Sequence, residues 1–594
     1  MLQTDADPEV RQMAAFALGL IGDASAAEPL RGALADPLPL IAGRAAEALG
    51  LIGDAASAPA IAKMVAAHAS AASAVAPDEA RVHVTAAADA FRLGVYALAR
   101  LKSYDGLAAS VLGPNGQATV QWWPVAYALQ RIEDARAAPA LLGLAANESP
   151  YTKAFAIKGL GQLREAAAVP LLLPLIDPAR AAAPATIEAI RAAGRIADDR
   201  ATAPLLKVLY ARDMNPTVRA ETLLALAKTG GEVGSDAFVD FLGDRSPAVR
   251  LAALQGLAER DEDAFLLVLS GLDPDPHYSV RAGLAALLAT KDPERALPRV
   301  TPMLTDSDAR VVPAVLAAMA RLEAPDVGRI LIDHLAKEDV GIRTAAAAAL
   351  GDVKPDGGVD ALVAAYKRGE SDLVIDTRAA VLEALSKYGA AAALPTLKAA
   401  LTDKDWALRV KAAELITSLD PSVDAAQAIR PAPTAANAID YTSARLVDPP
   451  VSPQVYIETE KGTIQIELDV LDAPITALNF MTLARRGYFD GLAFHRLVAN
   501  FVVQGGDPRG DGEGGPGYSI RDELNQEPYL RGTVGMALAW RDTGGSQFFI
   551  THSPQPHLDA RYTVFGRVTA GMEVVDALNQ WDVMTRVRVW DGTQ

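Results

Sequence analysis

A seven-residue segment, ALGLIGD, occurs twice near the start of the chain, at 17–23 and again at 48–54, a spacing of 31 residues. With Leu18 as the phase marker, apolar or small residues recur, mostly in steps of 31, at Leu49, Leu98, Leu129, Leu160, Ala193, Leu226, Leu257, Leu288, Met319, Leu350, Leu385 and Ile416. An Arg stands seven residues before many of these markers, as Arg250 and Arg281 do. A fixed period of this length predicts a solenoid of stacked repeats.

Each period contains two helical stretches. In residues 246–273, SPAVRLAALQGLAERDEDAFLLVLSGLD, two segments of helical apolar periodicity flank a short charged turn. Such a hairpin cannot bury its apolar faces alone, so it must stack on its neighbours. The unit resembles the HEAT repeat family, and about thirteen units cover residues 1–419. The resemblance implies a curved α-solenoid whose inner surface binds a protein partner, here an unidentified one.

The repeat array has two irregularities. The low-complexity run HASAASAVAPDEA at 68–80 lengthens one period, and we expect a flexible insertion in a loop there. Met1 aligns with the end of a first helix, so we expect the natural chain to begin further upstream, which leaves an export signal open. The neighbouring Trp122 and Trp123 are expected to form a buried pair, with an exposed contact patch as the alternative.

The helical period ends near Leu419 and a different pattern begins. Residues 420–453 are rich in Pro, Ala and Ser, and we assign them to a linker. From 454 to 594 the apolar period changes to two, first in VYIETEKGTIQIELD, where a turn at 460–462 indicates a hairpin. About eight strand-like runs and two helical segments, PITALNFMTLARRG and MEVVDALNQ, predict a closed antiparallel barrel.

Six short motifs lie within this second region, in the order FHR (494–496), FxxQGGD (501–507), GGSQFFI (544–550), HLD (557–559), VFGRV (564–568) and GMEVVD (571–576). With them, Gln454 to Val589 resembles the cyclophilins, the cyclosporin-sensitive class of peptidyl-prolyl isomerases. The resemblance implies a cyclophilin-like eight-stranded antiparallel β-barrel with two helices. It also implies isomerisation of X-Pro bonds in proline-containing peptides or unfolded proteins, without a cofactor or a metal.

The chemistry of this reaction asks for a hydrogen-bond donor. Rotation about an X-Pro bond crosses a barrier of about 20 kcal/mol because it breaks the amide conjugation. In the twisted state the proline nitrogen regains a lone pair, so a donor aimed at that nitrogen stabilises this state selectively. Arg496 holds the position of the family's catalytic arginine, and its guanidinium is planar and permanently charged.

One arginine is not sufficient for the expected acceleration. A charge-assisted hydrogen bond contributes roughly 1.5 to 3 kcal/mol, whereas four decades of rate need about 5 to 6 kcal/mol. An apolar pocket that holds the proline ring must supply the rest. By family position this pocket consists of Phe501, Val502, Phe549 and Leu558. By the same resemblance, Gln504 holds Arg496, and the remaining substrate-binding residues are Ala537, Leu538 and Gln547 in the peptide groove and His557 and Tyr562 at its rim.

Several of these positions depart from the family pattern. Val502 stands where a methionine is usual, and His557 replaces the tryptophan of cyclosporin-sensitive members, which predicts weak cyclosporin binding. Tyr562 replaces a histidine, and Leu538 replaces an asparagine, with little loss if that position acts through its backbone. The altered loop at 540–541 leaves the substrate preference open.

Composition narrows the remaining classes of function. The net charge of −17, without any basic run, argues against binding nucleic acid. The absence of cysteine excludes disulfides and thiol nucleophiles, and it fits either cytoplasm or periplasm. No apolar run approaches the roughly 18 residues of a transmembrane helix, and the scattered histidines give no metal site.

The sequence therefore predicts an isomerase barrel joined to a partner- or client-binding solenoid. Its alternative is a scaffold whose barrel binds proline peptides without turnover. Di-iron hydroxylases and phycobilin lyases also use HEAT units, but the repeats here contain no His-Glu pairs and no cue for a chromophore.

Overall fold

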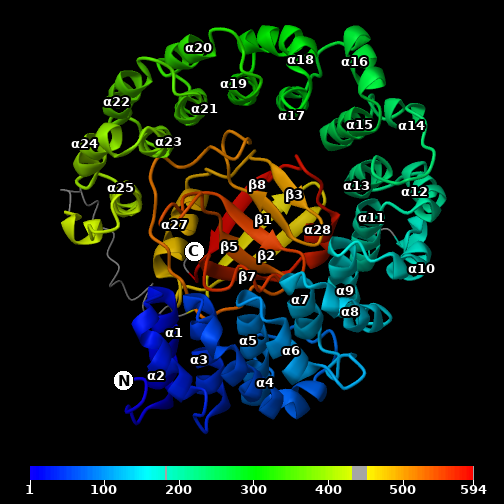
Figure 1. Cartoon of the computed structure of the whole chain (residues 1–594), viewed down its shortest axis with the longest axis vertical. Helices are drawn as coiled ribbons and strands as arrows, with labels where there is room; N and C mark the ends of the chain where they lie inside the picture. The colour runs from blue at the N-terminus through cyan, green and yellow to red at the C-terminus, as the bar shows by residue number, and fades with distance from the viewer. Residues whose placement is uncertain (181–182, 431–450, 593–594) are drawn as a thin grey trace.

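The computed structural model describes residues 1–180, 183–430 and 451–592, and it confirms a two-part architecture (Figure 1). Two layers of helices follow each other around a nearly complete ring, and a β-barrel lies inside this ring. Among the described residues, no helix combines the length and the apolar character needed to cross a bilayer.

The odd-numbered helices form the inner layer of the ring, next to the barrel (Figure 1). They are α1 (Pro8–Ile21), α3 (Pro39–Ile52), α5 (Ala86–Arg100), α7 (Trp123–Ile132), α9 (Pro150–Gln162), α11 (Pro184–Ile196), α13 (Pro216–Leu226), α15 (Pro247–Arg260), α17 (Tyr278–Leu288), α19 (Val312–Arg321), α21 (Val340–Val353), α23 (Asp376–Lys387) and α25 (Trp406–Leu419). Consecutive inner helices pack against each other, which buries the apolar repeat markers in one continuous core.

The even-numbered helices form the outer layer. They are α2 (Ala27–Ala33), α4 (Ala58–Ser73), α6 (Tyr104–Val111), α8 (Ala138–Ala145), α10 (Val169–Leu172), α12 (Thr202–Leu209), α14 (Asp236–Val239), α16 (Glu262–Gly271), α18 (Pro293–Val300), α20 (Val327–His334), α22 (Gly358–Gly369) and α24 (Ala390–Ala400). They pack on neighbouring inner helices, as α4 does on α5 and α16 does on α15, which a repeat of helical hairpins requires.

The arginine of the repeat motif joins one unit to the next. Arg250 and Arg281, near the starts of α15 and α17, form ion pairs of 2.6 and 2.7 Å with Asp275 and Asp306, each 25 residues further along the chain. The Asp275 carboxylate also accepts a hydrogen bond from the backbone N–H of His277, just before α17. The arginine therefore recurs with the period because it secures the entrance to the next inner helix.

The insertion at 68–80 begins as a helix, which corrects the expectation of a loop for that part. Its first residues continue helix α4 to Ser73. Trp122 and Trp123 form the expected buried pair, with 1% and 0% of their surface exposed. Both indole N–H groups donate to the carbonyl oxygen of Glu79, at 2.8 and 2.7 Å, and so anchor the end of the insertion.

The region assigned to a linker is only partly described, because residues 431–450 lie outside the described ranges. Its first part folds back on the solenoid: the 3₁₀ turn η9 (Ala425–Ala428) packs on α25, and Arg409 donates to the carbonyl of Arg430 at 2.6 Å. The assigned domain boundaries, 1–419, 420–453 and 454–594, stay predictions.

The barrel is one antiparallel sheet in the order β3-β4-β6-β5-β7-β2-β1-β8. Its strands are β1 (Gln454–Thr459), β2 (Gly462–Leu468), β3 (Arg496–Val498), β4 (Val502–Gly505), β5 (Thr533–Met536), β6 (Phe548–Thr551), β7 (Val564–Ala570) and β8 (Arg586–Trp590). A bridge between Ala493 and Val583 joins the segments that precede the two edge strands. Helices α27 (Pro474–Arg485) and α28 (Met572–Ala577) accompany the sheet, and its core contains the stacked rings of Phe480 and Phe489.

The inner surface of the solenoid holds the barrel of the same chain. Contacts between the two parts run from the first inner helix to the last, and they include hydrogen bonds from Gln12 to Gln526, Arg100 to the Asp559 carbonyl, Asn500 to the Pro184 carbonyl, Tyr278 to the Gly510 carbonyl and Trp406 to Asp542. The resemblance assigned this surface to a protein partner. The structure shows it occupied in cis.

Candidate active site

Arg496 opens the β3–β4 hairpin and lies directly opposite Gln504 in the strand register. Residues that face each other across an antiparallel pair project their side chains to the same side of the sheet. The Arg496 Nη1 accordingly donates to Gln504 Oε1 at 3.2 Å, and the guanidinium carbon lies 5.7 Å from the centre of the Phe501 ring. Arg496 is exposed, so its remaining N–H donors can reach a ligand.

A chain of side-chain hydrogen bonds supports this arginine from behind. Gln504 Nε2 donates to Gln547 Oε1 at 2.9 Å. Gln547 Nε2 in turn donates to the carbonyl oxygens of Gly512 and Gly514, at 2.7 and 2.9 Å. Each glutamine accepts through its oxygen and donates through its nitrogen, so the two amides are fixed in orientation.

Beside Arg496 lies a small apolar cluster, separate from the main core of the barrel. It contains the buried residues Val502, Tyr529, Phe549, Leu558 and Val564, with Phe501, Ala537 and Tyr562 packed on it. The Phe549 ring stacks on Tyr529 at 5.5 Å between centroids and meets Tyr562 edge-on at 5.9 Å. The structure therefore brings together the pocket residues that the resemblance assigned.

The sequence did not assign Tyr529 and Val564 to this cluster, and of the two only Val564 lies in one of the six motifs. Tyr529 was therefore missed altogether. It is 1% exposed, and its hydroxyl donates to the Thr563 carbonyl at 3.1 Å. Gly535 is the residue in the sequence that could have indicated a ring packed here. A Cβ at this position would lie 2.4 Å from the Tyr529 hydroxyl and 2.5 Å from the Phe549 ring. A glycine in the middle of a strand indicates such a close approach.

A pocket of about 290 Å³ adjoins the glutamine pair, and both parts of the chain line it. The barrel supplies Gln504, Gln547, Ala537 and Leu538, and the solenoid supplies residues 374–376 at the start of α23. Leu538 packs on the main barrel core and not on the apolar cluster, so it belongs to the wall of this pocket alone.

His557 lies between the apolar cluster and the solenoid. Its ring stacks on Phe501 with 5.5 Å between centroids. Burial, together with the positive charges of Arg131 and Lys158, lowers the pKa of His557 to about 3. At neutral pH the imidazole is therefore uncharged, and it extends the apolar rim at the position of the tryptophan of cyclosporin-sensitive members.

This histidine makes a testable contribution to stability. The unfolded chain takes up a proton on His557 near its ordinary pKa of about 6.5, whereas the folded protein does so only near 3. Between these values the unfolded state binds more protons, so stability falls as the pH is lowered through 6.5. We compare the unfolding free energy of His557→Gln with that of the wild type at each pH. The difference, variant minus wild type, should be about 1.4 kcal/mol larger at pH 5.5 than at pH 7.5.

Thermal unfolding at both pH values measures this difference. The parallel variant His83→Gln is the contrast: its side chain is 70% exposed and lies 3.7 Å from the Asp89 carboxylate, so its loss should bring no gain in stability at pH 5.5. A stability difference between His557→Gln and wild type that is the same at both pH values would contradict the burial of a neutral ring.

Comparisons with known proteins agree with this geometry. The family model described as "Cyclophilin type peptidyl-prolyl cis-trans isomerase/CLD" matches residues 454–591, and the HEAT repeat model matches residues 1–76, 180–258, 265–351 and 334–417.

Three curated relatives match the barrel region. The peptidyl-prolyl cis-trans isomerase of Synechococcus elongatus is 49% identical over 138 residues, which cover 23% of this chain and 95% of the relative. Peptidyl-prolyl cis-trans isomerase B of Bacillus subtilis is 50% identical over 137 residues, 23% of this chain and 96% of the relative. The isomerase of Helicobacter pylori is 49% identical over 135 residues, 22% and 83% of the two chains. By these matches and this fold, the chain belongs to the cyclophilin-type peptidyl-prolyl cis-trans isomerases and carries its isomerase barrel inside a solenoid of HEAT repeats.

Proposed function

We propose that Arg496 is the catalytic residue of this isomerase and that Gln504 holds it in place. The observation that carries the proposal is the position of the exposed guanidinium, hydrogen-bonded to Gln504 and close to the Phe501 ring at the edge of the apolar cluster. With the proline ring in this cluster, an N–H of Arg496 points to the proline nitrogen as it pyramidalises. This hydrogen bond is stronger in the twisted state than in either planar state, so it lowers the barrier.

The apolar residues hold the ring while the preceding carbonyl rotates. In the proposal Phe501, Val502, Phe549 and Leu558 contact the proline, with His557 and Tyr562 at the rim. Val502, Phe549 and Leu558 are at most 6% exposed and lie in one cluster, which supports a fixed pocket. A fixed pocket keeps the ring still while the amide twists, so binding restricts motion to the reacting bond.

We further propose that Ala537, Leu538 and Gln547 bind the peptide on the other side of Arg496. These residues line the pocket that the solenoid closes at residues 374–376. A site with walls from both parts of the chain suits an extended segment, such as a proline peptide or an unfolded protein. If the substrate is an unfolded protein, the isomerase assists protein folding. Because the barrel occupies the inner surface, a protein partner of the solenoid would contact its outer helices.

Exchange spectroscopy of a short proline peptide tests the proposed activity in the full chain. We expect catalytic amounts of the protein to bring cis–trans exchange from tens of seconds to well below one second, by roughly two decades or more. The alternative is a scaffold that binds proline peptides without turnover. Peptide resonances that shift on binding while the exchange rate stays at its uncatalysed value would establish this alternative.

A further inference from the structure

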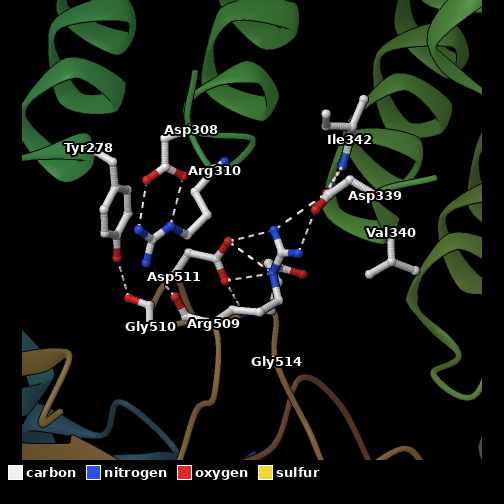
Figure 2. Close-up of polar contacts among 12 residues, drawn as sticks. Tyr278, Asp308, Arg310, Asp339, Val340, Ile342, Arg509, Gly510, Asp511 and Gly514 are labelled. Carbon is white, nitrogen blue, oxygen red and sulfur yellow. Dashed lines mark hydrogen bonds and ion pairs between the residues drawn. The ribbon is translucent and has the colours of Figure 1, made fainter. Parts of the chain in front are cut away.

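The loop at residues 507–514, between β4 and β5, is held by three solenoid residues (Figure 2). The Tyr278 hydroxyl at the start of α17 donates to the Gly510 carbonyl at 2.6 Å. Arg310, just before α19, donates to the Arg509 carbonyl at 2.7 Å. The Arg509 side chain reaches back to Asp339, before α21, with 2.7 Å between Nη1 and Oδ2. We call residues 507–514 the contact loop.

The solenoid side of this contact is fixed independently of the loop. Asp308 binds the Arg310 guanidinium through both oxygens, at 2.9 and 2.7 Å, and the guanidinium carbon lies 3.5 Å from the centre of the Tyr278 ring. Asp339 also accepts a hydrogen bond from the Ile342 N–H at 3.0 Å and so caps α21. These side chains therefore present a fixed surface to the contact loop.

The ion pair at its centre is charged at neutral pH. Burial raises the pKa of Asp339, but the hydrogen bonds from Arg509 and from the backbone N–H of Ile342 outweigh this effect, and the net pKa lies below its ordinary value. Arg509 also pairs with Asp511 of the contact loop at 2.9 Å, which orients its guanidinium. A movement of Asp339 is thus transmitted to the loop through Arg509.

The contact loop is internally stiff. The Asp507 carboxylate is 2% exposed and accepts hydrogen bonds from the backbone N–H groups of Arg509, at 2.8 Å, and Gly512, at 2.5 Å. Gly510 and Gly512 have φ angles of +76° and +96°, which favour glycine and give the turn its tight shape. The anchored end at Arg509 therefore determines where the Gly512 carbonyl lies.

The other end of the contact loop, at Gly512 and Gly514, is hydrogen-bonded to the residues that hold Arg496. The carbonyls of Gly512 and Gly514 accept from Gln547, Gln547 accepts from Gln504, and Gln504 accepts from Arg496. We infer that Arg509 is a positioning residue, through which the solenoid's Asp339 sets the placement of Arg496. This inference rests on the proposed catalytic role of Arg496, and it makes the solenoid part of the isomerase machinery.

The variant Asp339→Ser isolates this contact. Serine keeps the cap of α21, since it is as good an N-cap residue as aspartate, but its shorter neutral side chain releases Arg509. We expect kcat to fall roughly three- to tenfold with KM within about a factor of two, because the loss concerns a transition-state interaction. Arg509→Ala should do the same, and the double variant should be no slower than either single one.

Three matched variants separate positioning from loss of structure. Gln12→Ala removes another hydrogen bond between solenoid and barrel, 2.7 Å long and outside this chain of contacts, and should leave kcat unchanged. Asp339→Asn keeps the cap and one acceptor oxygen for Arg509, so its kcat should lie between that of Asp339→Ser and that of the wild type. It replaces Asp339→Ser in the test if the serine variant does not fold. The decisive test adds Asp339→Ser to a protein that already carries Arg496→Ala. The double variant should have the same kcat as Arg496→Ala alone, because Asp339 acts through Arg496.

The outcomes distinguish this inference from the proposed function. An unchanged kcat in Asp339→Ser, or an equal fold-loss with and without Arg496, would overturn the positioning role while leaving the role of Arg496 intact. Full activity of Arg496→Ala would overturn the proposed catalytic role and the inference together. A kcat loss confined to the chain with Arg496 intact supports the inference.

Discussion

Replacing Arg496 by alanine is expected to lower kcat/KM for proline peptides roughly ten- to hundredfold. The variant removes the donor that strengthens its hydrogen bond as the amide twists, so most of the loss should appear in kcat and little in KM. Arg496 is exposed, and its removal leaves Gln504 with its hydrogen bond to Gln547. Thermal stability should therefore stay close to that of the wild type.

Two further variants sharpen this test. Arg496→Lys keeps the charge but loses the planar fork of donors, so an intermediate rate is expected. Arg486→Ala removes another exposed arginine of the barrel, at the end of α27, and controls for the change in net charge. If Arg496→Ala retained the wild-type rate at saturating peptide, the apolar cluster alone would carry the catalysis and the proposed mechanism would fail.

Local motifs made the polar part of the site predictable. Arg496 and Gln504 belong to one short hairpin, and Gln547 lies two residues before Phe549, the register partner of Gln504 in β6. In a sheet, such short spacings fix which side chains meet. The sequence did not predict that Tyr529 belongs to the apolar cluster. This residue lies outside any strand and is buried by tertiary contacts around Gly535, which produce no periodic pattern in the sequence.

The docking of the barrel inside the solenoid could not be predicted from the sequence. The contacts depend on single polar side chains far apart in the chain, such as Gln12 with Gln526 and Asn500 with Glu188. None of these residues stands out by period or composition. The insertion at 68–80 was misjudged for another reason: its alanines favour helix, and α4 continues into it as far as Ser73.

The solenoid contains one ion cluster whose loss should be costly. Arg378 on α23 is 1% exposed, and its guanidinium binds both oxygens of Asp403, at 2.6 and 2.7 Å, and one of Asp405, at 2.6 Å. Asp403 also accepts from the Tyr366 hydroxyl at 2.7 Å. Arg378→Met would leave the Asp403 carboxylate, 3% exposed, without its counterion. We expect a loss of about 3 to 5 kcal/mol in unfolding free energy.

Urea unfolding of the full chain measures this loss, and Arg200→Ala is the matched control because its ion pair with Asp198 is solvent-exposed. Most of the expected penalty comes from the orphaned carboxylate, so adding Asp403→Asn to Arg378→Met should recover part of the stability. A loss of unfolding free energy below about 1 kcal/mol in Arg378→Met would contradict this expectation. It would mean that the attraction within the cluster only offsets the cost of desolvating its charges.

The loss should be local before it is global, because each unit of a solenoid is stabilised mainly by its neighbours. Hydrogen exchange in Arg378→Met should rise first in α23–α25. Helix α25 reaches the barrel through Trp406, which donates to Asp542 at 2.8 Å, and through Lys411, whose ammonium lies 4.3 Å from the centre of the Trp540 ring. Faster exchange should then extend to the 540–542 loop while α1–α9 keep their protection. An equal rise in every unit would mean that the barrel joins the ring into one cooperative body.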